Sequence, residues 1–241
     1  MRIAVLSDIH GNLTAIQAVI SDLNKRNIDG CIFLGDLIDY GPHSNEVIQM
    51  LSVFKWPIYC NIWGNHEDAI IKQDFSRFSS ERGRESARFT QQNLSVQSKI
   101  FIKTNMQSSG LHKFMIDGKK CLAIHGSMED CFWKSITPES SLTSYEPYDY
   151  VFSGHSHEPH YFEEYYPTQN PETRNRKKTI FINPGSVGQP RNLNSLTQYV
   201  VVNIETEELE FVKIEYDYEK EIADFSSSVD PFYKERLKKG I

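Results

Sequence analysis

The sequence predicts an α/β fold built around a parallel β-sheet. Three observations support this: short continuous apolar runs, helical spacing of the apolar residues between them, and turn residues at the junctions. The runs Ile3–Leu6 and Cys31–Leu34 are typical of strands buried on both faces, and Pro57 precedes a third run, Ile58–Trp63. Because strands alternate with helical segments, we expect right-handed crossovers and a site at the carboxyl ends of the strands.

Two helices are expected between these strands. Asn12 is placed to cap the first helix. The Gly41-Pro42 pair then breaks the chain, and Ser44 is placed to cap the second. The apolar residues at helical spacing are Leu13, Ile16, Ile20 and Leu23 in the first helix and Val47, Ile48 and Leu51 in the second.

The later part of the chain predicts further strands. An Asp117-Gly118 turn joins His112–Ile116 to Lys119–Ile124, and Asp-Gly between apolar runs is a strong hairpin signal. The other strands, the last two paired as a hairpin, are expected at Tyr148–Phe152, Thr179–Ile182, Thr197–Ile204 and Leu209–Tyr216.

Three segments lack strand character. Residues 68–110 are polar and rich in Ser, Arg and Gln, so we expect a helical insertion or cap beside the site. The charged tail 217–241 is expected to pack as a surface helix. Residues 166–178, with two prolines and four basic residues, are expected to form a mobile loop. With no repeat and no clear linker, residues 1–241 are interpreted as a single domain.

The composition disfavours several classes of protein. The chain has 241 residues, 39% of them hydrophobic, and its net charge of −6 provides no global basic field for nucleic acid. No stretch approaches the roughly 18–20 apolar residues that span a membrane. The first apolar run meets Asp8 too early for a signal peptide. The four cysteines form no C-x-x-C pair, so we expect reduced thiols in a cytoplasmic protein.

Five of the expected strands end in residues of metal-ligand type. A pair of divalent ions needs several such ligands, including a carboxylate that bridges both ions. Imidazole and carboxylate ligands without thiolates favour Mn, Fe, Zn or Ni over Mg or Ca. Each short motif is weak alone, but their joint order predicts a binuclear metal site. The residues are Asp8, His10, Asp36, Asn65, His125, His155 and His157.

The spacing of these residues suggests their roles. Asp8 and His10 are two positions apart, so we expect both on one face of an extended strand, and His155 and His157 repeat this spacing. His66 follows Asn65 and would point elsewhere, free for proton transfer. Two divalent ions outweigh two carboxylates in charge, so the loaded site would attract an anionic phosphate.

These motifs together resemble those of the calcineurin-like metallophosphoesterases, in order over nearly the whole chain. They are Asp8-x-His10, Gly35-Asp36, Gly64-Asn65-His66-Glu67, His125-Gly126 and Gly154-His155-x-His157. The segment 183–191, Asn-Pro-Gly-Ser-Val-Gly-Gln-Pro-Arg, resembles a later motif of the compact prokaryotic, phosphodiesterase-type branch, as does Tyr40-Gly41-Pro42.

The resemblance implies a four-layer αββα sandwich, in which two mixed β-sheets lie face to face with helices outside. It also implies two divalent metal ions, with Asp36 bridging them. The implied ligands are Asp8, His10, Asp36 and His157 for one ion, and Asp36, Asn65, His125 and His155 for the other.

Three further residues are candidates for support or substrate contact. Glu67 stands where many relatives have Asp and is interpreted as supporting the ligands. Asp39 is expected either to orient a metal-ligand histidine or only to cap a turn. Arg191 is a candidate phosphate contact, with a surface arginine after a proline turn as the equal alternative.

The sequence therefore predicts a metal-dependent phosphoesterase, specifically a phosphodiesterase acting on small phosphodiesters or nucleotides. The hypothesis is in-line attack by a metal-bridging hydroxide, with Asn65 offsetting charge and His66 protonating the leaving oxygen. The alternatives are a phosphomonoesterase, including a protein phosphatase, and a non-catalytic scaffold that binds a partner. Nucleic-acid cleavage is disfavoured by the acidic balance and the lack of an aromatic-basic stripe, and no membrane partner is expected.

Overall fold

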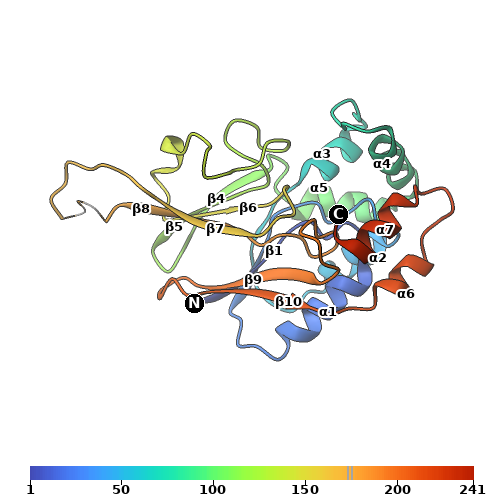
Figure 1. The fold of residues 1–241 in the computed structure, drawn as a ribbon, viewed down its shortest axis with the longest axis horizontal. Coiled ribbons are helices and arrows are strands. Elements are labelled where there is room, and N and C mark those ends of the chain that lie inside the picture. The colour runs from blue at the N-terminus through green and yellow to red at the C-terminus, as the bar shows by residue number, and fades with distance from the viewer. Residues whose placement is uncertain (173, 175) are drawn as a thin grey trace.

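The computed structural model describes residues 1–172, 174 and 176–241, which form two β-sheets packed face to face with helices gathered at one end (Figure 1). The first sheet has the strand order β10-β9-β1-β2-β3. The β1, β2 and β3 strands are parallel, and β9 runs antiparallel to both β1 and β10. The bounds are β1 Arg2–Leu6, β2 Gly30–Phe33, β3 Ile58–Asn61, β9 Thr197–Asn203 and β10 Leu209–Ile214.

The second sheet has the strand order β4-β5-β6-β8-β7. Here β5, β6 and β8 are parallel, with antiparallel strands at both edges. The edge strand β7 was not expected, because its residues are half-exposed and form no continuous apolar run. The bounds are β4 Leu111–Ile116, β5 Lys119–Ile124, β6 Tyr150–Ser153, β7 His160–Tyr165 and β8 Lys178–Asn183. The predicted pair of mixed sheets is confirmed.

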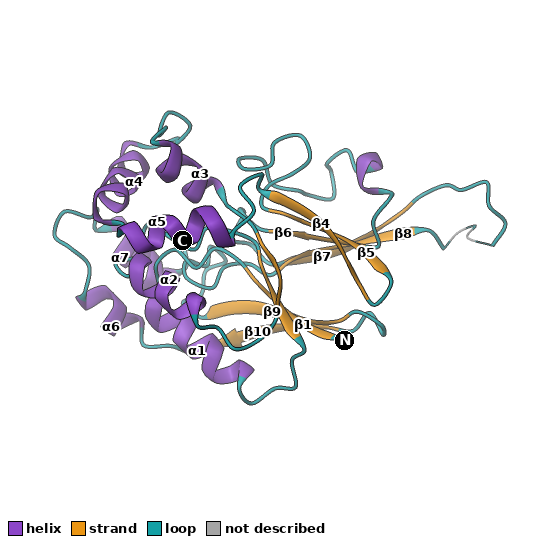
Figure 2. Cartoon of the chain, turned by 180° about the vertical axis from the view of Figure 1, so that it is seen from behind, coloured by secondary structure: helices purple, strands orange, loops and turns teal. Residues whose placement is uncertain are grey.

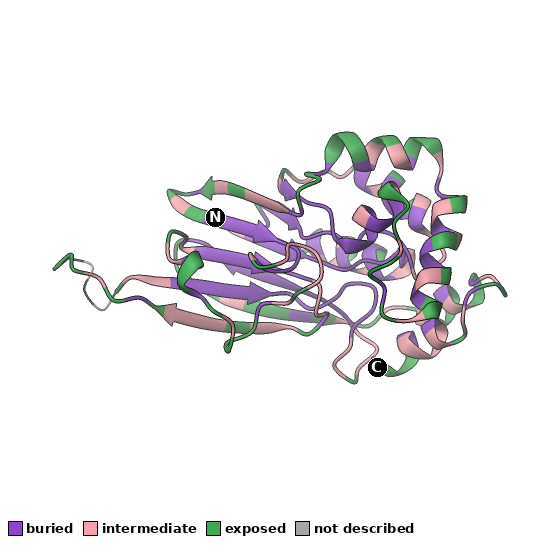
Figure 3. Cartoon of the chain, turned by 90° about the horizontal axis from the view of Figure 1, so that it is seen from above, coloured by how far each residue is buried: buried purple, intermediate pink, exposed green. Residues whose placement is uncertain are grey.

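The two faces of β1 serve different cores. Side chains alternate along a strand, so Ile3 and Val5 face the second sheet, where they pack with Phe152 and other apolar residues of its strands. Ala4 and Leu6 face the helices instead. Figure 3 shows the inner strands buried along most of their length, and burial on both faces explains the continuous apolar runs of the sequence.

Helices cover the outer face of the first sheet (Figure 2). They are α1 (Leu13–Leu23), α2 (Ser44–Ser52) and α5 (Val96–Asn105). Asn12 caps α1 as expected, accepting the Ala15 backbone N–H. The predicted cap of α2 is wrong by one residue: His43 occupies that position without a side-chain bond, and the Ser44 hydroxyl instead accepts the backbone N–H of Asp39.

The polar segment 68–110 is helical, as expected. It contains most of α3 (Asn65–Lys72), then α4 (Glu81–Asn93) and α5. The tail forms two helices, α6 (Tyr218–Ala223) and α7 (Phe232–Lys239), where one was expected. Both Figure 1 and Figure 2 place α4 and α7 at the same end of the molecule.

A buried carboxylate anchors the tail to the first helix. Glu221 of α6 is fully buried and accepts the backbone N–H groups of Leu13 and Thr14 at 3.1 and 3.0 Å. His43 Nδ1 lies 2.8 Å from the same carboxylate. Glu221 therefore joins the tail, the start of α1 and the turn before α2.

The outer face of the second sheet is covered by residues 126–149, which include the 3₁₀ turn η1 (Thr143–Tyr145). Tyr145 and Leu142 pack there against Phe181 of β8. The outer layer on this sheet, which the αββα arrangement expects to be helical, is therefore a loop segment. Within 166–178, expected to be mobile, positions 173 and 175 lie outside the described residues. Among the helices described, none is both long and apolar enough to cross a membrane.

Candidate metal centre

The seven predicted ligand residues come together where five strands end. Asp8 and His10 follow β1, Asp36 follows β2, and Asn65 lies beyond β3 at the start of α3. From the second sheet, His125 follows β5, and His155 and His157 follow β6. Six of the seven are buried, and His155 is half-buried.

The backbone is left-handed at five of these residues, so the expectation that Asp8 and His10 share a face of an extended strand is wrong. Strand β1 already ends at Leu6. Positive φ costs about 1–3 kcal/mol for a residue other than glycine and concentrates at functional sites, and Asp, Asn and His tolerate it best. The φ angles are 53° at Asp8, 49° at His10, 52° at Asp36, 67° at His155 and 61° at His157.

The first group of ligand atoms comes from Asp8, His10, Asp36 and His157, and these atoms all lie within 4.8 Å of one another. The Nε2 atoms of His10 and His157 are 3.2 Å apart. Asp8 Oδ1 lies 3.3 Å from His157 Nε2, and Asp36 Oδ2 lies 3.6 Å from His10 Nε2.

The second group contains Asp36, His125 and His155, again within 4.8 Å. Asn65 Oδ1 lies 2.9 Å from His125 Nε2 and 3.0 Å from His155 Nδ1. Asp36 is the one residue in both groups, which is the position of a bridging carboxylate. The two groups divide the residues as the family resemblance implies, while the role of each as a ligand stays a prediction.

The protonation of three histidines indicates that a cation fits here. The Nδ1 atoms of His10, His125 and His157 lie 3.2, 2.7 and 2.6 Å from backbone carbonyl oxygens. A carbonyl only accepts, so each Nδ1 carries the proton and each Nε2 presents a lone pair. The facing lone pairs of His10 and His157 would repel without a cation between them. Asp8 Oδ1 is also buried without a hydrogen-bond partner among the described residues.

The electrostatics favour the charge states that metal binding requires. Burial lowers the pKa of His155 to about 3 and holds the pKa values of His10 and His157 well below their usual range. Burial alone would raise the pKa of Asp36, but His125 and His66 beside it hold that pKa well below its ordinary value. The site therefore offers neutral imidazoles at His10, His155 and His157 and an ionised carboxylate at Asp36. Burial would lower the pKa of His125, but the Asp36 carboxylate beside it raises that pKa to about 9.

Glu67 supports the loops that carry the ligands and does not face them. Its fully buried carboxylate accepts the backbone N–H groups of Asp36, Leu37 and Gly64, each at 2.8 Å. A Cβ atom on Gly64 would lie 2.1 Å from Asp36 Oδ1, so this position requires glycine. The bonds to Glu67 thus hold the loop that follows β2 close to the loop that follows β3.

Asp39 contacts His66, which is not one of the predicted metal-ligand histidines. Asp39 Oδ2 lies 2.7 Å from His66 Nδ1. Its other oxygen accepts the hydroxyls of Ser86 and Thr90 of α4, both at 2.7 Å. Sequence reasoning missed these two partners, although residues four apart share one face of a helix. His66 Nε2 remains directed toward the centre, 3.9 Å from Asp36 Oδ2.

The segment 183–191, singled out in the sequence, packs under the centre. The Ser186 hydroxyl donates to the Asp8 carbonyl at 2.7 Å, and His157 Nδ1 donates to the Gln189 carbonyl at 2.6 Å. A Cβ atom on Gly188 would lie 1.7 Å from the Ile9 carbonyl oxygen, so glycine is required. The segment therefore fixes the positions of Asp8, which follows a strand of the first sheet, and His157, which follows a strand of the second.

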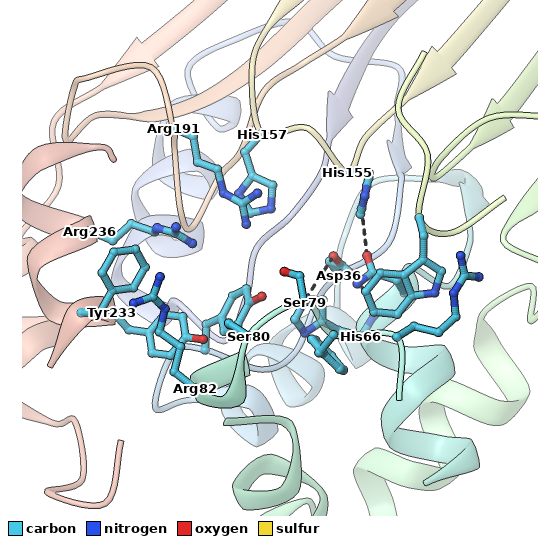
Figure 4. Close-up of a pocket in the computed structure, with 16 residues that line it drawn as sticks. Asp36, His66, Ser79, Ser80, Arg82, His155, His157, Arg191, Tyr233 and Arg236 are labelled. Atoms are coloured by element: carbon cyan, nitrogen blue, oxygen red, sulfur yellow. Dashed lines mark hydrogen bonds and ion pairs between the residues drawn. The ribbon is translucent and has the colours of Figure 1, made fainter. Parts of the chain in front are cut away.

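A cavity of about 460 Å³ opens beside the centre (Figure 4). Asp36, Asn65, His66, His155 and His157 lie at its base. Arg191 lines it, as its predicted phosphate contact requires, together with residues of α4 and α7 that sequence reasoning did not identify. These are Arg82, Phe232, Tyr233 and Arg236.

Comparison with known proteins agrees with this geometry. Residues 1–207 match the model of the calcineurin-like phosphoesterase superfamily domain. The chain is 28% identical over 227 residues to an uncharacterized protein of Methanocaldococcus jannaschii, covering 90% of this chain and 89% of that one. The crystal structure of a metallophosphoesterase from Sphaerobacter thermophilus has a TM-score of 0.78 and 26% identity, with full coverage of both chains.

A hypothetical protein from Pyrococcus horikoshii also has a TM-score of 0.78, at 16% identity and covering 100% of this chain and 98% of that one, which shows the same fold. The two mixed sheets, the grouped Asp and His residues at their edge and the match over most of the sequence lead to one conclusion. The chain belongs to the calcineurin-like phosphoesterase superfamily.

Proposed function

We propose that the chain is a binuclear metal-dependent phosphoesterase that hydrolyses small phosphodiesters or nucleotides. The observation that carries this proposal is Asp36, whose carboxylate belongs to both groups of ligand atoms. The histidine and carboxylate ligands suit Mn, Fe, Zn or Ni. When bound, such ions lower the pKa of a coordinated water and offset charge on the phosphoryl oxygens.

The residues of the chain position the ester and manage the proton. Asn65 and Arg191 line the cavity and orient the phosphoryl group by hydrogen bonds. His66 protonates the leaving oxygen, since its Nδ1 is held by Asp39 and its Nε2 is directed toward the centre. Burial would lower the pKa of His66, but Asp36 and Asp39 raise it, which favours the protonated acid.

The size of the cavity favours a small substrate over a folded protein. Its volume of about 460 Å³ falls in the range of roughly 300–1,000 Å³ of small-molecule sites. Ser79, Ser80 and Arg82, at the start of α4, border it together with Phe232 and Tyr233 of α7. A protein surface would have to displace these segments, so protein phosphatase activity is the less favoured alternative.

Metal analysis coupled to a substrate panel tests the proposal. The panel contains bis-p-nitrophenyl phosphate, p-nitrophenyl phosphate and a phosphoserine peptide. We expect two metal ions per chain, preferred hydrolysis of the diester, loss of activity with a chelator and recovery when manganese is added. Preference for the monoester or the peptide would support the alternative phosphatase. Tight metal binding with no hydrolysis would support the non-catalytic scaffold.

A further inference from the structure

Three arginines from distant parts of the chain converge on one wall of the cavity. Arg82 lies on α4, Arg191 follows β8, and Arg236 lies on α7. Figure 4 shows their side chains gathered on the side of the cavity opposite His155. We call this set the arginine wall. Its position is unusual in a chain whose net charge is −6, because nothing in the overall composition favours a local excess of positive charge.

The arginine wall has no acidic partner within the described part of the chain. No ion pair there involves Arg82, Arg191 or Arg236, whereas the neighbouring Arg84 and Arg88 both pair with Glu81. Arg191 Nε is buried and makes no hydrogen bond to any residue that the structure describes. The wall therefore retains N–H donors that are available to a ligand.

An aromatic ring holds two of these guanidinium groups in place. The Cζ atom of Arg82 lies 3.9 Å from the ring centroid of Phe232, and that of Arg236 lies 4.5 Å from it. Such contacts fix the plane of a guanidinium group while leaving N–H edges free. Burial, with Arg191 and Arg82 close by, lowers the pKa of Arg236 to about 10. The like charges repel one another, and a bound anion would relieve this repulsion.

We propose that the arginine wall binds a second phosphate group of the substrate, so that the preferred substrate is a phosphoester carrying a further dianionic phosphate. The inference deepens the proposed function and rests on it, because the reacting phosphate occupies the metal centre. Guanidinium groups suit this ligand, since they bind phosphate through paired N–H donors.

The aromatic residues of the cavity favour this choice over recognition of a nucleobase. Tyr233 is already stacked on Tyr40, with ring centroids 4.5 Å apart. Phe232 contacts Arg82 and Arg236, and the guanidinium group of Arg77 lies 5.2 Å from the ring centroid of Trp133. These rings are engaged within the protein, whereas the three guanidinium groups of the wall make one hydrogen bond among the described residues, from Arg236 Nε to the Ile241 carbonyl oxygen at 2.5 Å. Charge is therefore the recognition element that the wall offers.

Kinetics on a matched substrate pair tests the inference. The pair is thymidine 5′-(p-nitrophenyl phosphate) with and without a 3′-phosphate, assayed with manganese-loaded protein. We expect kcat/KM to favour the substrate with the second phosphate by about tenfold or more, as charged hydrogen bonds suggest. Arg82→Ala and Arg236→Ala should each reduce this ratio severalfold. Arg88→Ala removes the same charge from α4 outside the cavity and should leave the ratio unchanged.

Phosphate binding without metal provides a second measurement, independent of activity. Inorganic phosphate is titrated into chelator-treated protein and followed by ³¹P NMR. Arg82→Ala and Arg236→Ala should weaken binding severalfold, and Arg88→Ala should not. If the protein hydrolyses the simple ester but neither the ratio nor phosphate binding depends on Arg82 and Arg236, the inference is overturned and the proposed function stands. If binding depends on them but no ester is hydrolysed, the anion site stands and the proposed function is wrong.

Discussion

The metal centre and the arginine wall face the same cavity but are built in different ways. The residues of the centre follow strands and are mostly buried, and histidines such as His125 and His157 are fixed by hydrogen bonds that they donate to backbone carbonyls. The wall comes from α4, α7 and a loop, and Arg82 is exposed. On the proposed function, the sheet edges position the reacting groups, and the helices around them select the substrate. The predictions below test this division of roles. Substitutions at the centre should cause severe losses of activity, and substitutions around it should cause smaller losses of activity or stability.

The largest effect is expected at the residue shared by both groups of ligand atoms. Asp36→Asn preserves size but removes the bridging charge, so it should release both metal ions and reduce hydrolysis to background. Metal content by mass spectrometry and turnover of bis-p-nitrophenyl phosphate provide the measurement. Asp68→Asn, at a half-buried carboxylate of α3 that pairs with Lys72, is the control. A variant at Asp36 that kept two ions per chain would refute the bridging role.

The next effect separates proton transfer from metal binding. His66→Gln should reduce kcat by about 10²–10⁴-fold, the usual contribution of a general acid, while metal content is unchanged. The loss should be larger for an alkyl ester than for the p-nitrophenyl ester, whose leaving group needs less help from an acid. Equal losses on both esters would rule out the acid role, and His112→Gln on β4 controls for loss of an imidazole elsewhere.

A smaller effect is expected where α4 supports the centre. Asp39→Asn removes one of the charges that raise the pKa of His66. That pKa should therefore fall, and the alkaline limb of the kcat profile should move to lower pH, because the protonated acid is lost earlier. Turnover at neutral pH should fall with little change in KM. An unmoved limb would mean that Asp39 only holds the loop.

The smallest effect tests the attachment of the tail. Glu221→Gln replaces a buried carboxylate that accepts two backbone N–H groups, so the free energy of unfolding should fall by about 1–3 kcal/mol. Urea denaturation measures this change. Glu219→Gln at an exposed position of the same helix should have almost no effect. If the two variants were equally stable, Glu221 would not anchor the tail.

The sequence predicted which residues come together at the strand ends, because those signals are local. Residue type and position after an apolar run were sufficient to assign Asp36, His125 and His155 to one predicted site, whereas their division between two ions was implied by the family resemblance. The left-handed backbone at His10 could not be predicted, because it depends on a bond between the His10 N–H and the Asp36 carbonyl, which come from separate loops. Strand β7 was missed for another reason: it lies at the edge of its sheet, where its residues are half-exposed and form no apolar pattern.

The arginine wall was beyond prediction for a different reason. Arg82 and Arg236 sit in polar helices whose sequences resemble any solvated surface. Their meeting depends on how α7 packs beside α4 through Phe232, and no periodicity encodes that contact. Only Arg191 was noticed, because it belongs to a motif near the centre.

The tail has a practical consequence for redesign of the protein. Residues 217–241 lie beyond the last strand and beyond the part matched by the family model, and they reach the cavity from outside both sheets. Exchange of these residues alone, with Glu221 retained, offers a way to change the ligand preference of the cavity while the metal centre stays unchanged. A library restricted to these positions would sample specificity without disturbing any residue that follows β1, β2, β5 or β6.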